Sequence, residues 1–489
     1  MAENLTRKGF LGAAAAAGAA LLAGCDSSQN SAQATGAKTA KLDPSNPTNI
    51  VVWHYYNGSQ QAAFDALVTE FNTGAGKEKG IYVDSQSLGS ISDLEAAISD
   101  SLAGAVGSKD LPTIFSSYSD TAFTVQQAGK LAEVGQYFTS DELARYVDGY
   151  IKEGYLLGDD RLYLLPVAKS TETLMVDATD WDAFAAATGA SYDDLATVEG
   201  VVKTAQAYYD WSGGRAFYGR DSMSNYFVIG MKQMGADIFE ASDGRATLNL
   251  DRDKVRRLWD GYYVPYVNGW FKSSGKFRSD DVKTVEILAY TGSTASATYF
   301  PDQVTPDADT VSTIDYKVLA APIMEGGKRI CVQQGAGMCV SSGDDEHEYA
   351  AVEFLKWFSE PENNLRFACQ SSYLPVLEEA NSVEALDAAI REYGITVSDK
   401  TYDTLKVVLG SFDEEGFYAS GCFENGFAAR KVLDYNLSDK AEADRAAVEE
   451  AVADGASVSD AVAPYVTDEA FDAWYATFKT LLEAAIQSK

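Results

Sequence analysis

An α/β fold built on a parallel sheet is predicted by the pattern that follows residue 48. Apolar segments at 50–53, 81–83 and 112–115 have the length of short strands. The two stretches between them carry apolar residues at helical spacing. Strands that alternate with helices in this way pair in parallel, with the helices packed on the faces of the sheet.

Each of these two helices is indicated by its own apolar stripe. The stripe of the first helix consists of Phe64, Leu67, Val68 and Phe71. The stripe of the second helix consists of Ile91, Leu94, Ile98 and Leu102. Ligands of parallel sheets bind at the carboxyl ends of the strands, so we expect the loops at 53–59, 87–92 and 116–121 to border a binding site.

The rest of the chain is predicted to be mainly helical. Residues 191–270 are rich in tyrosine and tryptophan, 335–341 have the pattern of a strand, and 348–358 form an amphipathic helix. Acidic residues at the start of that helix suit the helix dipole. The last fifty residues are predicted to be helices with one apolar stripe, made of Phe471, Trp474, Phe478 and Leu482.

The first residues have the features of an export signal. Arg7 and Lys8 precede an apolar run at 11–23, which is the arrangement of a secretory signal peptide. A bilayer-spanning helix needs about 20 apolar residues, so this run is too short to cross a membrane. The run ends in Leu-Ala-Gly-Cys at 22–25, which resembles a bacterial lipobox. The sequence therefore predicts a signal peptide at 1–24 and a lipid attached to Cys25.

Residues 25–47 are expected to form a flexible tether, because they contain too few apolar side chains to pack a core. The export route stays open between the general secretory and the twin-arginine pathway. Residues 6–11 resemble a twin-arginine motif, but Lys8 stands where a second arginine is usual.

Charge excludes some classes of partner. Without residues 1–24 the chain keeps 37 of its 39 basic and 71 of its 72 acidic residues, so its net charge is near −34. Nucleic acids and anionic lipid surfaces are therefore poor partners for the folded part. The length that remains after the tether suggests two large lobes.

The sequence offers no positive evidence for catalysis or for a cofactor. Only two histidines are present, which excludes a metal site built from several histidines. No Gly-x-Ser-x-Gly motif occurs. Chance pairs among 72 acidic residues leave a glycosidase open as an alternative. The disulfide state of the last four cysteines also stays open; they are Cys331, Cys339, Cys369 and Cys422.

The end of the first strand is a candidate binding site. Trp53, His54 and Tyr55 lie where that strand meets its loop. Aromatic side chains at the carboxyl end of a strand can stack on a ligand, although the same residues can also belong to the core.

Three segments carry a resemblance to a known family. They are VVWHYYNGSQQAAFDALVTEFN at 51–72, LYLLPVAKSTETLMVD at 162–177 and AAVEFLKWFSEPENNLRFACQSSYLPV at 350–376. They resemble the extracellular solute-binding proteins, family 1, of ABC importers, and most of all the glycerol-3-phosphate-binding type. The resemblance implies a type II periplasmic-binding-protein fold, with two α/β lobes, a hinge and a central cleft. The lobes would comprise 48–163 with 323–371, and 164–322 with 372–489.

The resemblance also implies a set of binding residues. The family's contacts to phosphate fall on Ser170, Ser293 or Thr294, Gly335, Tyr373 and Arg430. Hydroxyls, a backbone N–H and a guanidinium are suitable donors to a phosphate.

The other end of the expected site departs from the family pattern. The family's acidic residue falls at Ser119, with Asp120 one place later, and its tyrosine aligns with Ile91 or Ser92. Residues 219–225 lack the family's tryptophans. We therefore expect the anion end to be retained and the organic part of the solute to differ.

Together these features predict a monomeric, lipid-anchored, extracytoplasmic protein without enzymatic activity. It would capture a carbohydrate or a glycerol-phosphate-like organophosphate and deliver it to an ABC permease. Two alternatives stay open: a secreted hydrolase of glycosides or phosphodiesters, and a receptor that senses a solute without transport.

The anchor leads to a first testable prediction. Cys25→Ala removes the thiol that carries the lipid, so the protein should be released from membranes or should fail to be processed. Fractionation of cells followed by detection of the protein measures this. A variant that stays with the membranes at full yield would contradict the lipobox interpretation.

Overall fold

The computed structural model describes residues 36–242, 244–306, 309–411 and 416–487. The predicted signal peptide at 1–24 and the anchor Cys25 lie outside the described residues. None of the helices in the described part of the chain combines the length and the apolarity that a membrane-spanning segment needs.

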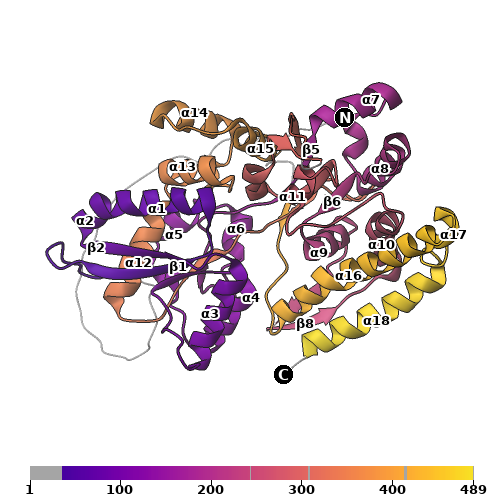
Figure 1. Ribbon diagram of the computed structural model, residues 1–489. Helices are drawn as coiled ribbons and strands as arrows, with labels where there is room; N and C mark the ends of the chain where they lie inside the picture. The colour runs from indigo at the N-terminus through magenta and orange to yellow at the C-terminus, as the bar shows by residue number, and fades with distance from the viewer. Residues whose placement is uncertain (1–35, 243, 307–308, 412–415, 488–489) are drawn as a thin grey trace, which may run out of the picture. The chain divides into compact units, whose positions relative to one another are not determined.

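The first lobe is built on a five-stranded sheet of order β2-β1-β3-β14-β4, of which β1 and β2 are labelled in Figure 1. Its strands are β1 (Thr48–His54), β2 (Ile81–Ser87), β3 (Ile114–Ser117), β4 (Leu164–Leu165) and β14 (Gly337–Val340). The pairs of β1 with β2 and β3 are parallel, as predicted. β14 pairs antiparallel with β3 and β4, and β4 directly follows residue 163, where the first segment of this lobe is expected to end.

Helices cover both faces of this sheet. Alternate side chains of a strand point to opposite faces, so residues of one strand enter two different clusters. One hydrophobic cluster contains Ile50 and Val52 of β1, and another contains Trp53. The helices of this lobe are α1 (Gly58–Thr73), α2 (Ala75–Lys79), α3 (Ile91–Ala103), α4 (Ser119–Gln127), α5 (Ser140–Leu143), α6 (Asp148–Lys152), α12 (Asp345–Ser359) and α13 (Pro361–Ser371). The two predicted stripes and the predicted helix at 348–358 correspond to α1, α3 and α12.

The second lobe contains a four-stranded sheet of order β12-β5-β9-β6. Its strands are β5 (Glu172–Asp177), β6 (Tyr218–Arg220), β9 (Ala289–Ser293) and β12 (Tyr316–Ala320). β5 runs antiparallel to β9 and β12, whereas β6 and β9 are parallel. Smaller two-stranded pairs are β7 (Phe239–Ser242) with β8 (Arg245–Leu248), β10 (Gln303–Val304) with β11 (Ser312–Thr313), and β13 (Ile330–Val332) with β15 (Gly416–Tyr418).

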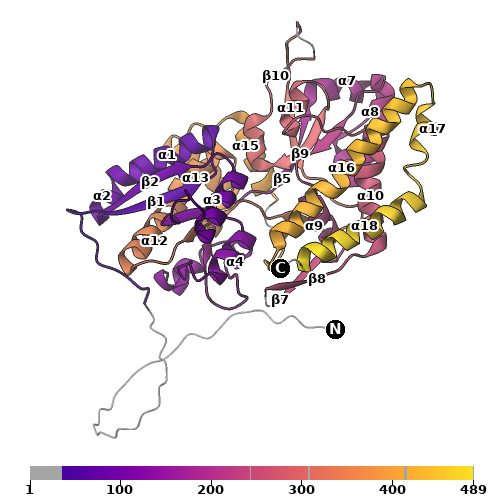
Figure 2. The same cartoon turned by 60° about the horizontal axis from the view of Figure 1, so that its bottom comes forward.

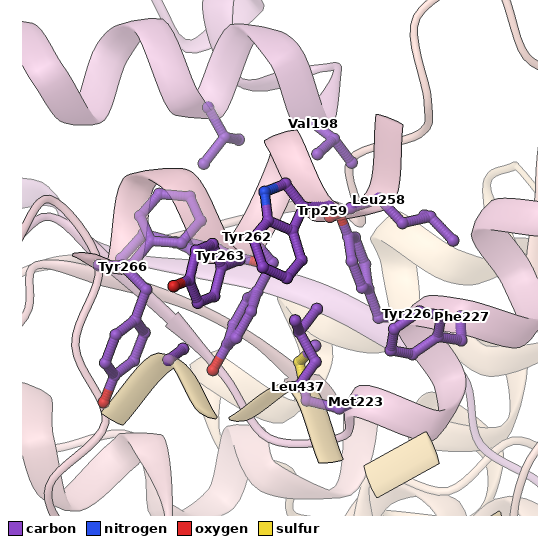
Figure 3. Close-up of a cluster of buried hydrophobic side chains, with 14 of the residues drawn as sticks. Val198, Met223, Tyr226, Phe227, Leu258, Trp259, Tyr262, Tyr263, Tyr266 and Leu437 are labelled. Atoms are coloured by element: carbon purple, nitrogen blue, oxygen red, sulfur yellow. The ribbon is translucent and has the colours of Figure 1, made fainter. Parts of the chain in front are cut away.

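Aromatic side chains dominate the core of the second lobe. Trp259 and Tyr263 stack with ring centroids 3.7 Å apart, and both are fully buried. Figure 3 shows them among the aromatic and aliphatic side chains of this cluster. The helices here are α7 (Ala178–Thr188), α8 (Val198–Ser212), α9 (Met223–Gln233), α10 (Arg252–Val267), α11 (Arg278–Lys283), α16 (Gly426–Ala453), α17 (Val458–Val462) and α18 (Asp468–Gln487).

The C-terminal helices belong to this core. Figures 1 and 2 show α16 and α18 side by side, and the two helices are in contact. The predicted stripe of α18 is buried in the cluster, as its spacing requires. Two further helices, α14 (Val383–Tyr393) and α15 (Asp399–Leu409), pack against α13.

The four cysteines outside the predicted anchor are placed mainly in the interior. Cys331, Cys339 and Cys369 are buried, and Cys422 is partly exposed. Burial raises the pKa of the Cys369 thiol to about 12. Cys339, Cys369 and Cys422 are free thiols.

Three stretches of chain meet at two consecutive residues where the chain passes between the sheets. Lys169 and Ser170 lie between β4 and β5. Lys169 forms a bridge with Leu374, and Ser170 forms one with Gln334. The second bridge is reciprocal, since the Ser170 N–H donates to the Gln334 carbonyl at 2.8 Å and the Gln334 N–H donates back at 3.0 Å. These bridges join the segments around residues 169–170, 334 and 374, which we call the passages between the lobes.

A buried cation lies at the centre of these passages. The Lys169 side chain is 0% exposed; its ammonium pairs with Glu153 and donates to the Gly335 carbonyl at 2.8 Å. Gln333 donates a further hydrogen bond to the Glu153 carboxylate at 2.8 Å. A positive φ of 94° at position 335 favours glycine there, and a Cβ would lie 3.0 Å from the Ala168 carbonyl.

This ion pair leads to a prediction about stability. Lys169→Met should lower the free energy of unfolding by about 3–5 kcal/mol, because it leaves the Glu153 carboxylate buried without its cation. Urea unfolding measures the loss. The exposed pair of Lys152 with Asp148 provides the control, and Lys152→Met should cost less than about 1 kcal/mol. Equal losses for the two variants would contradict the structural role of Lys169.

Candidate functional site

A cavity of about 310 Å³ has walls from both lobes. The first lobe contributes residues that follow β2 and β3; they are Ile91, Ser92, Glu95, Tyr118, Ser119 and Asp120. The second lobe contributes the N-terminal end of α9 and one face of α16. The cavity therefore borders two of the three loops expected from the parallel strands, those at 87–92 and 116–121.

One face of α16 lines the cavity over two turns. Phe427, Arg430, Lys431, Asp434 and Tyr435 have the i, i+3, i+4, i+7, i+8 spacing of a single helix face. The aromatic rings at the two ends are exposed, 41% for Phe427 and 59% for Tyr435. This face offers flat apolar surfaces at both ends and charged groups between them.

The start of α16 is fixed by a close approach to the first lobe. A Cβ at Gly426 would lie 2.3 Å from a carboxylate oxygen of Asp120, so a larger residue does not fit there. The backbone N–H of Phe423 donates a hydrogen bond to the same carboxylate. Asp120 of α4 is thus the point where the first lobe touches the segment that leads into α16.

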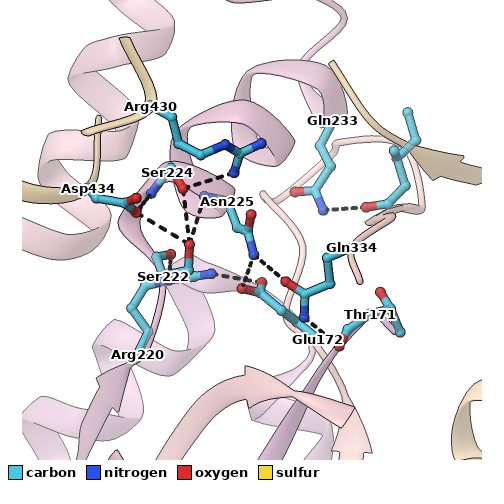
Figure 4. A network of polar contacts seen from close by, with 11 residues as sticks. Thr171, Glu172, Arg220, Ser222, Ser224, Asn225, Gln233, Gln334, Arg430 and Asp434 are labelled. Carbon is cyan, nitrogen blue, oxygen red and sulfur yellow. Dashed lines mark hydrogen bonds and ion pairs between the residues drawn. The ribbon is translucent and has the colours of Figure 1, made fainter. Parts of the chain in front are cut away.

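The N-terminal end of α9 is tied to α16 by hydrogen bonds (Figure 4). The Ser224 N–H donates to Asp434 Oδ1 at 2.7 Å, and Arg430 Nη1 donates to Ser224 Oγ at 3.2 Å. A carboxylate at the N-terminus of a helix is stabilised by the helix dipole. The three side chains therefore hold a donor-rich helix end at the cavity wall.

Two carboxyl groups on the cavity have raised pKa values. Burial raises the pKa of Asp120 to about 6, although the nearby Arg430 guanidinium opposes the shift. Burial also raises the pKa of Glu95, whose carboxylate accepts a hydrogen bond from Thr121 Oγ1 at 3.1 Å. The cavity thus holds acids that bind protons more readily than exposed carboxylates do.

Of the site residues predicted from the sequence, three line this cavity: Ser119, Asp120 and Arg430. Tyr55 and Tyr373 lie together, with their hydroxyl oxygens 3.0 Å apart. The Ala336 N–H donates to the Tyr55 hydroxyl at 3.4 Å.

The remaining residues of the expected phosphate set lie beside the passages between the lobes. Ser170 and Gly335 belong to the passages themselves. Thr294 is 0% exposed, and its N–H donates to the Thr171 carbonyl at 2.8 Å. Ser293 caps the short helix that follows β9. These residues are outside the walls of the 310 Å³ cavity, and their contact with a solute stays a prediction.

Trp53 and His54 are core residues, which corrects the expectation that they contact a ligand. Trp53 is 4% exposed and His54 is 0% exposed. His54 Nε2 lies 2.9 Å from Ser85 Oγ, and its Nδ1 accepts from the Tyr56 N–H at 3.2 Å. Burial lowers the pKa of His54 to about 4, so the ring is neutral at pH 7. Both faces of the sheet are covered by helices, so neither side chain reaches the cavity.

Several cavity residues were not predicted from the sequence. They are Glu95, Glu153, Ser222, Ser224, Asn225, Phe427 and Tyr435. The segment at 222–225 follows β6, so recognition of 218–220 as a strand would have pointed to it by the carboxyl-end rule. The residues of α16 are more than 190 positions further along the chain, and no local pattern connects them with that loop.

The raised pKa of Asp120 leads to a prediction about pH. Between about pH 4 and 6 the folded chain holds a proton that the unfolded chain has lost, so stability falls as the pH rises through this window. In Asp120→Asn the side chain at this position no longer titrates, so this loss of stability disappears. The variant should be more stable than the parent at pH 7, on the order of 1 kcal/mol, and equal to it near pH 4.

Urea unfolding at the two pH values measures this difference. Asp439→Asn, an exposed change on α16, controls for the loss of one negative charge. The same pH dependence in parent and Asp120→Asn would show that Asp120 is not the group that titrates.

Comparisons with known proteins identify the family. The family model of bacterial extracellular solute-binding proteins matches residues 66–393. A search of curated protein sequences gives no match. Among solved structures, the cyclic α-maltosyl-1,6-maltose binding protein of Arthrobacter globiformis is 18% identical, with a TM-score of 0.61 over 91% of this chain and 100% of the other.

Two further structures share the fold. UgpB of Mycobacterium tuberculosis, in complex with glycerophosphocholine, is 16% identical, with a TM-score of 0.62 over 90% of this chain and 99% of the other. The maltose/maltodextrin-binding domain MalE of Bdellovibrio bacteriovorus, bound to maltotriose, is 14% identical, with a TM-score of 0.59 over 89% and 100%. At these identities the likeness establishes the two-lobed fold. From the family model, this chain belongs to the bacterial extracellular solute-binding proteins, which act outside the cytoplasm and bind solutes without converting them.

Proposed function

We propose that this protein is the lipid-anchored solute-binding component of an ABC importer and that its solute is a carbohydrate. The observation that carries the proposal is the cavity between the two lobes, with aromatic rings and polar groups on one helix face. A binding site for a small molecule combines apolar walls with a few well-placed polar groups.

The lining of the cavity suits a sugar. Phe427 and Tyr435 are exposed aromatic side chains that can pack against the apolar face of a pyranose, and the charged residues between them can bind hydroxyls. Two of the proteins that share the fold are described with maltose-type oligosaccharides. Both observations favour a carbohydrate.

An organophosphate is the second candidate, and Arg430 on the cavity wall favours it. A guanidinium can bind a phosphate through two parallel hydrogen bonds. UgpB, which shares the fold, is described in complex with glycerophosphocholine. Arg430 faces acidic neighbours, however, and the rest of the expected phosphate set lies off this cavity.

Attachment and delivery complete the proposal. A lipid on Cys25 and the tether at 25–47 would hold the two lobes at the outer face of the membrane, as a monomer within reach of the permease. Binding closes the lobes over the solute, and the open arrangement dominates without it. The permease then accepts the solute from the closed form.

The proposal is tested by a thermal-shift screen with two panels, one of neutral mono- and oligosaccharides and one of sugar phosphates and glycerophosphodiesters. A ligand at 100 times its Kd adds about 2.7 kcal/mol of stability, so a true solute should raise the melting temperature clearly. The best compound should also reduce the radius of gyration in solution scattering. If neither panel shifts the melting temperature of well-folded protein, the proposed function is wrong.

A further inference from the structure

We propose that Asn225 determines specificity in this cavity, because its side-chain oxygen requires a hydroxyl of the solute beside Arg430. The inference rests on the proposed function and specifies one functional group of the solute. Asn225 lies in the first turn of α9, where its N–H donates at 3.2 Å to Oγ of Ser222, the residue that caps the helix.

The orientation of the Asn225 amide is fixed by its neighbours. Asn225 Nδ2 donates to Glu172 Oε1 at 3.0 Å and to Gln334 Oε1 at 2.8 Å. A carboxylate can only accept hydrogen bonds, so the atom that faces Glu172 must be the amide nitrogen. Gln334 is oriented in the same way, because its Nε2 donates to the Thr171 carbonyl at 3.1 Å. Both amide hydrogens of Asn225 are therefore used.

The carboxylate behind Asn225 is itself held in place. Arg220 Nη2 donates to Glu172 Oε2 at 2.8 Å, and the two residues are 8% and 7% exposed. Arg220 Nε also donates to the Ser222 carbonyl at 3.0 Å. A turned Asn225 amide would place its oxygen against a buried carboxylate oxygen, which is strongly unfavourable.

The Asn225 oxygen is left to face the cavity. Asn225 is 5% exposed and belongs to the cavity wall. Figure 4 shows its oxygen on the side of Arg430, away from Glu172 and Gln334. No hydrogen bond within the described part of the chain reaches this oxygen, so it remains a free acceptor on the cavity wall. A solute that enters the cavity can supply the missing donor.

A hydroxyl matches this arrangement, because it donates and accepts at once. It can donate to the Asn225 oxygen and accept from the Arg430 guanidinium, which has donors beyond the one given to Ser224. An ionised phosphate or carboxylate can only accept; it would satisfy Arg430 but would turn lone pairs toward the Asn225 oxygen. We therefore expect a sugar or polyol hydroxyl at this point, and the phosphate of any organophosphate elsewhere.

The test uses the compound from the two panels that binds the full-length protein most tightly, together with its set of monodeoxy analogues. Calorimetry should show that Asn225→Ala weakens the parent compound roughly 5- to 100-fold. One monodeoxy analogue should bind the unchanged protein with a similar loss, and it should lose nothing further in Asn225→Ala. Asn268→Ala, which removes an amide outside the cavity wall, should leave all affinities unchanged.

Glu172→Gln provides a second variant that keeps the side-chain volume. Its amide can accept or donate toward Asn225, so only Gln334 still fixes the orientation of the Asn225 amide, and the discrimination against the critical deoxy analogue should fall. The inference is overturned if Asn225→Ala, folded by circular dichroism, binds the parent compound as well as the unchanged protein does. It is also overturned if every deoxy analogue loses the same factor in both proteins. Failure of every panel compound to bind would instead overturn the proposed function, and this inference with it.

Discussion

The buried ammonium of Lys169 is the constraint on which the arrangement of the lobes depends. A cation in the interior must be paired and hydrogen-bonded, and Lys169 finds its partners in Glu153 and in the Gly335 carbonyl. Those partners come from different parts of the chain, so the need to satisfy one charge draws them together. The neighbouring bridge between Ser170 and Gln334 then brings the Gln334 side chain to the cavity wall.

Function follows from that position, because Gln334 belongs to the passage between the lobes and also touches Asn225. Asn225 is held by a hydrogen bond to Gln334, so any solute that binds Asn225 contacts a side chain that is tied to the passages between the lobes. The buried ion pair of Glu172 and Arg220 belongs to the same hydrogen-bond network and keeps the Asn225 amide in one orientation. In this protein the polar groups of the cavity wall and of the passages between the lobes form one hydrogen-bond network.

The electrostatics of the cavity differ from those expected for an anion site. Asp120, Glu95 and Asp434 share the cavity walls with Arg430 and Lys431, in a chain with a net charge of −33. A phosphate would meet these carboxylates at close range, where screening by salt is weak. A neutral polyhydroxylated solute can use carboxylates as acceptors and the guanidinium as a donor. The sign of the local charge therefore agrees with the hydroxyl expected at Asn225.

Local sequence patterns predicted the first strands, the helices that follow them and the stripe of α18, because periodic burial leaves a periodic apolar pattern. They also placed Ser119 and Asp120 at the end of a strand. The same reasoning was wrong for Trp53 and His54, since a strand covered on both faces buries polar and aromatic residues alike. The antiparallel strands β14 and β4 gave no local indication of their partners.

The sequence by itself determined the class of fold and the acidic character, and it predicted an export signal, because these depend on composition and on neighbours in the chain. Only the tertiary structure determined which residues line the cavity. Residues 118–120, 222–225 and 427–435 meet there, although no short-range pattern links them. Pairing between distant segments depends on packing and on the satisfaction of buried charges such as Lys169 and Glu172, and those requirements exist only in the folded chain.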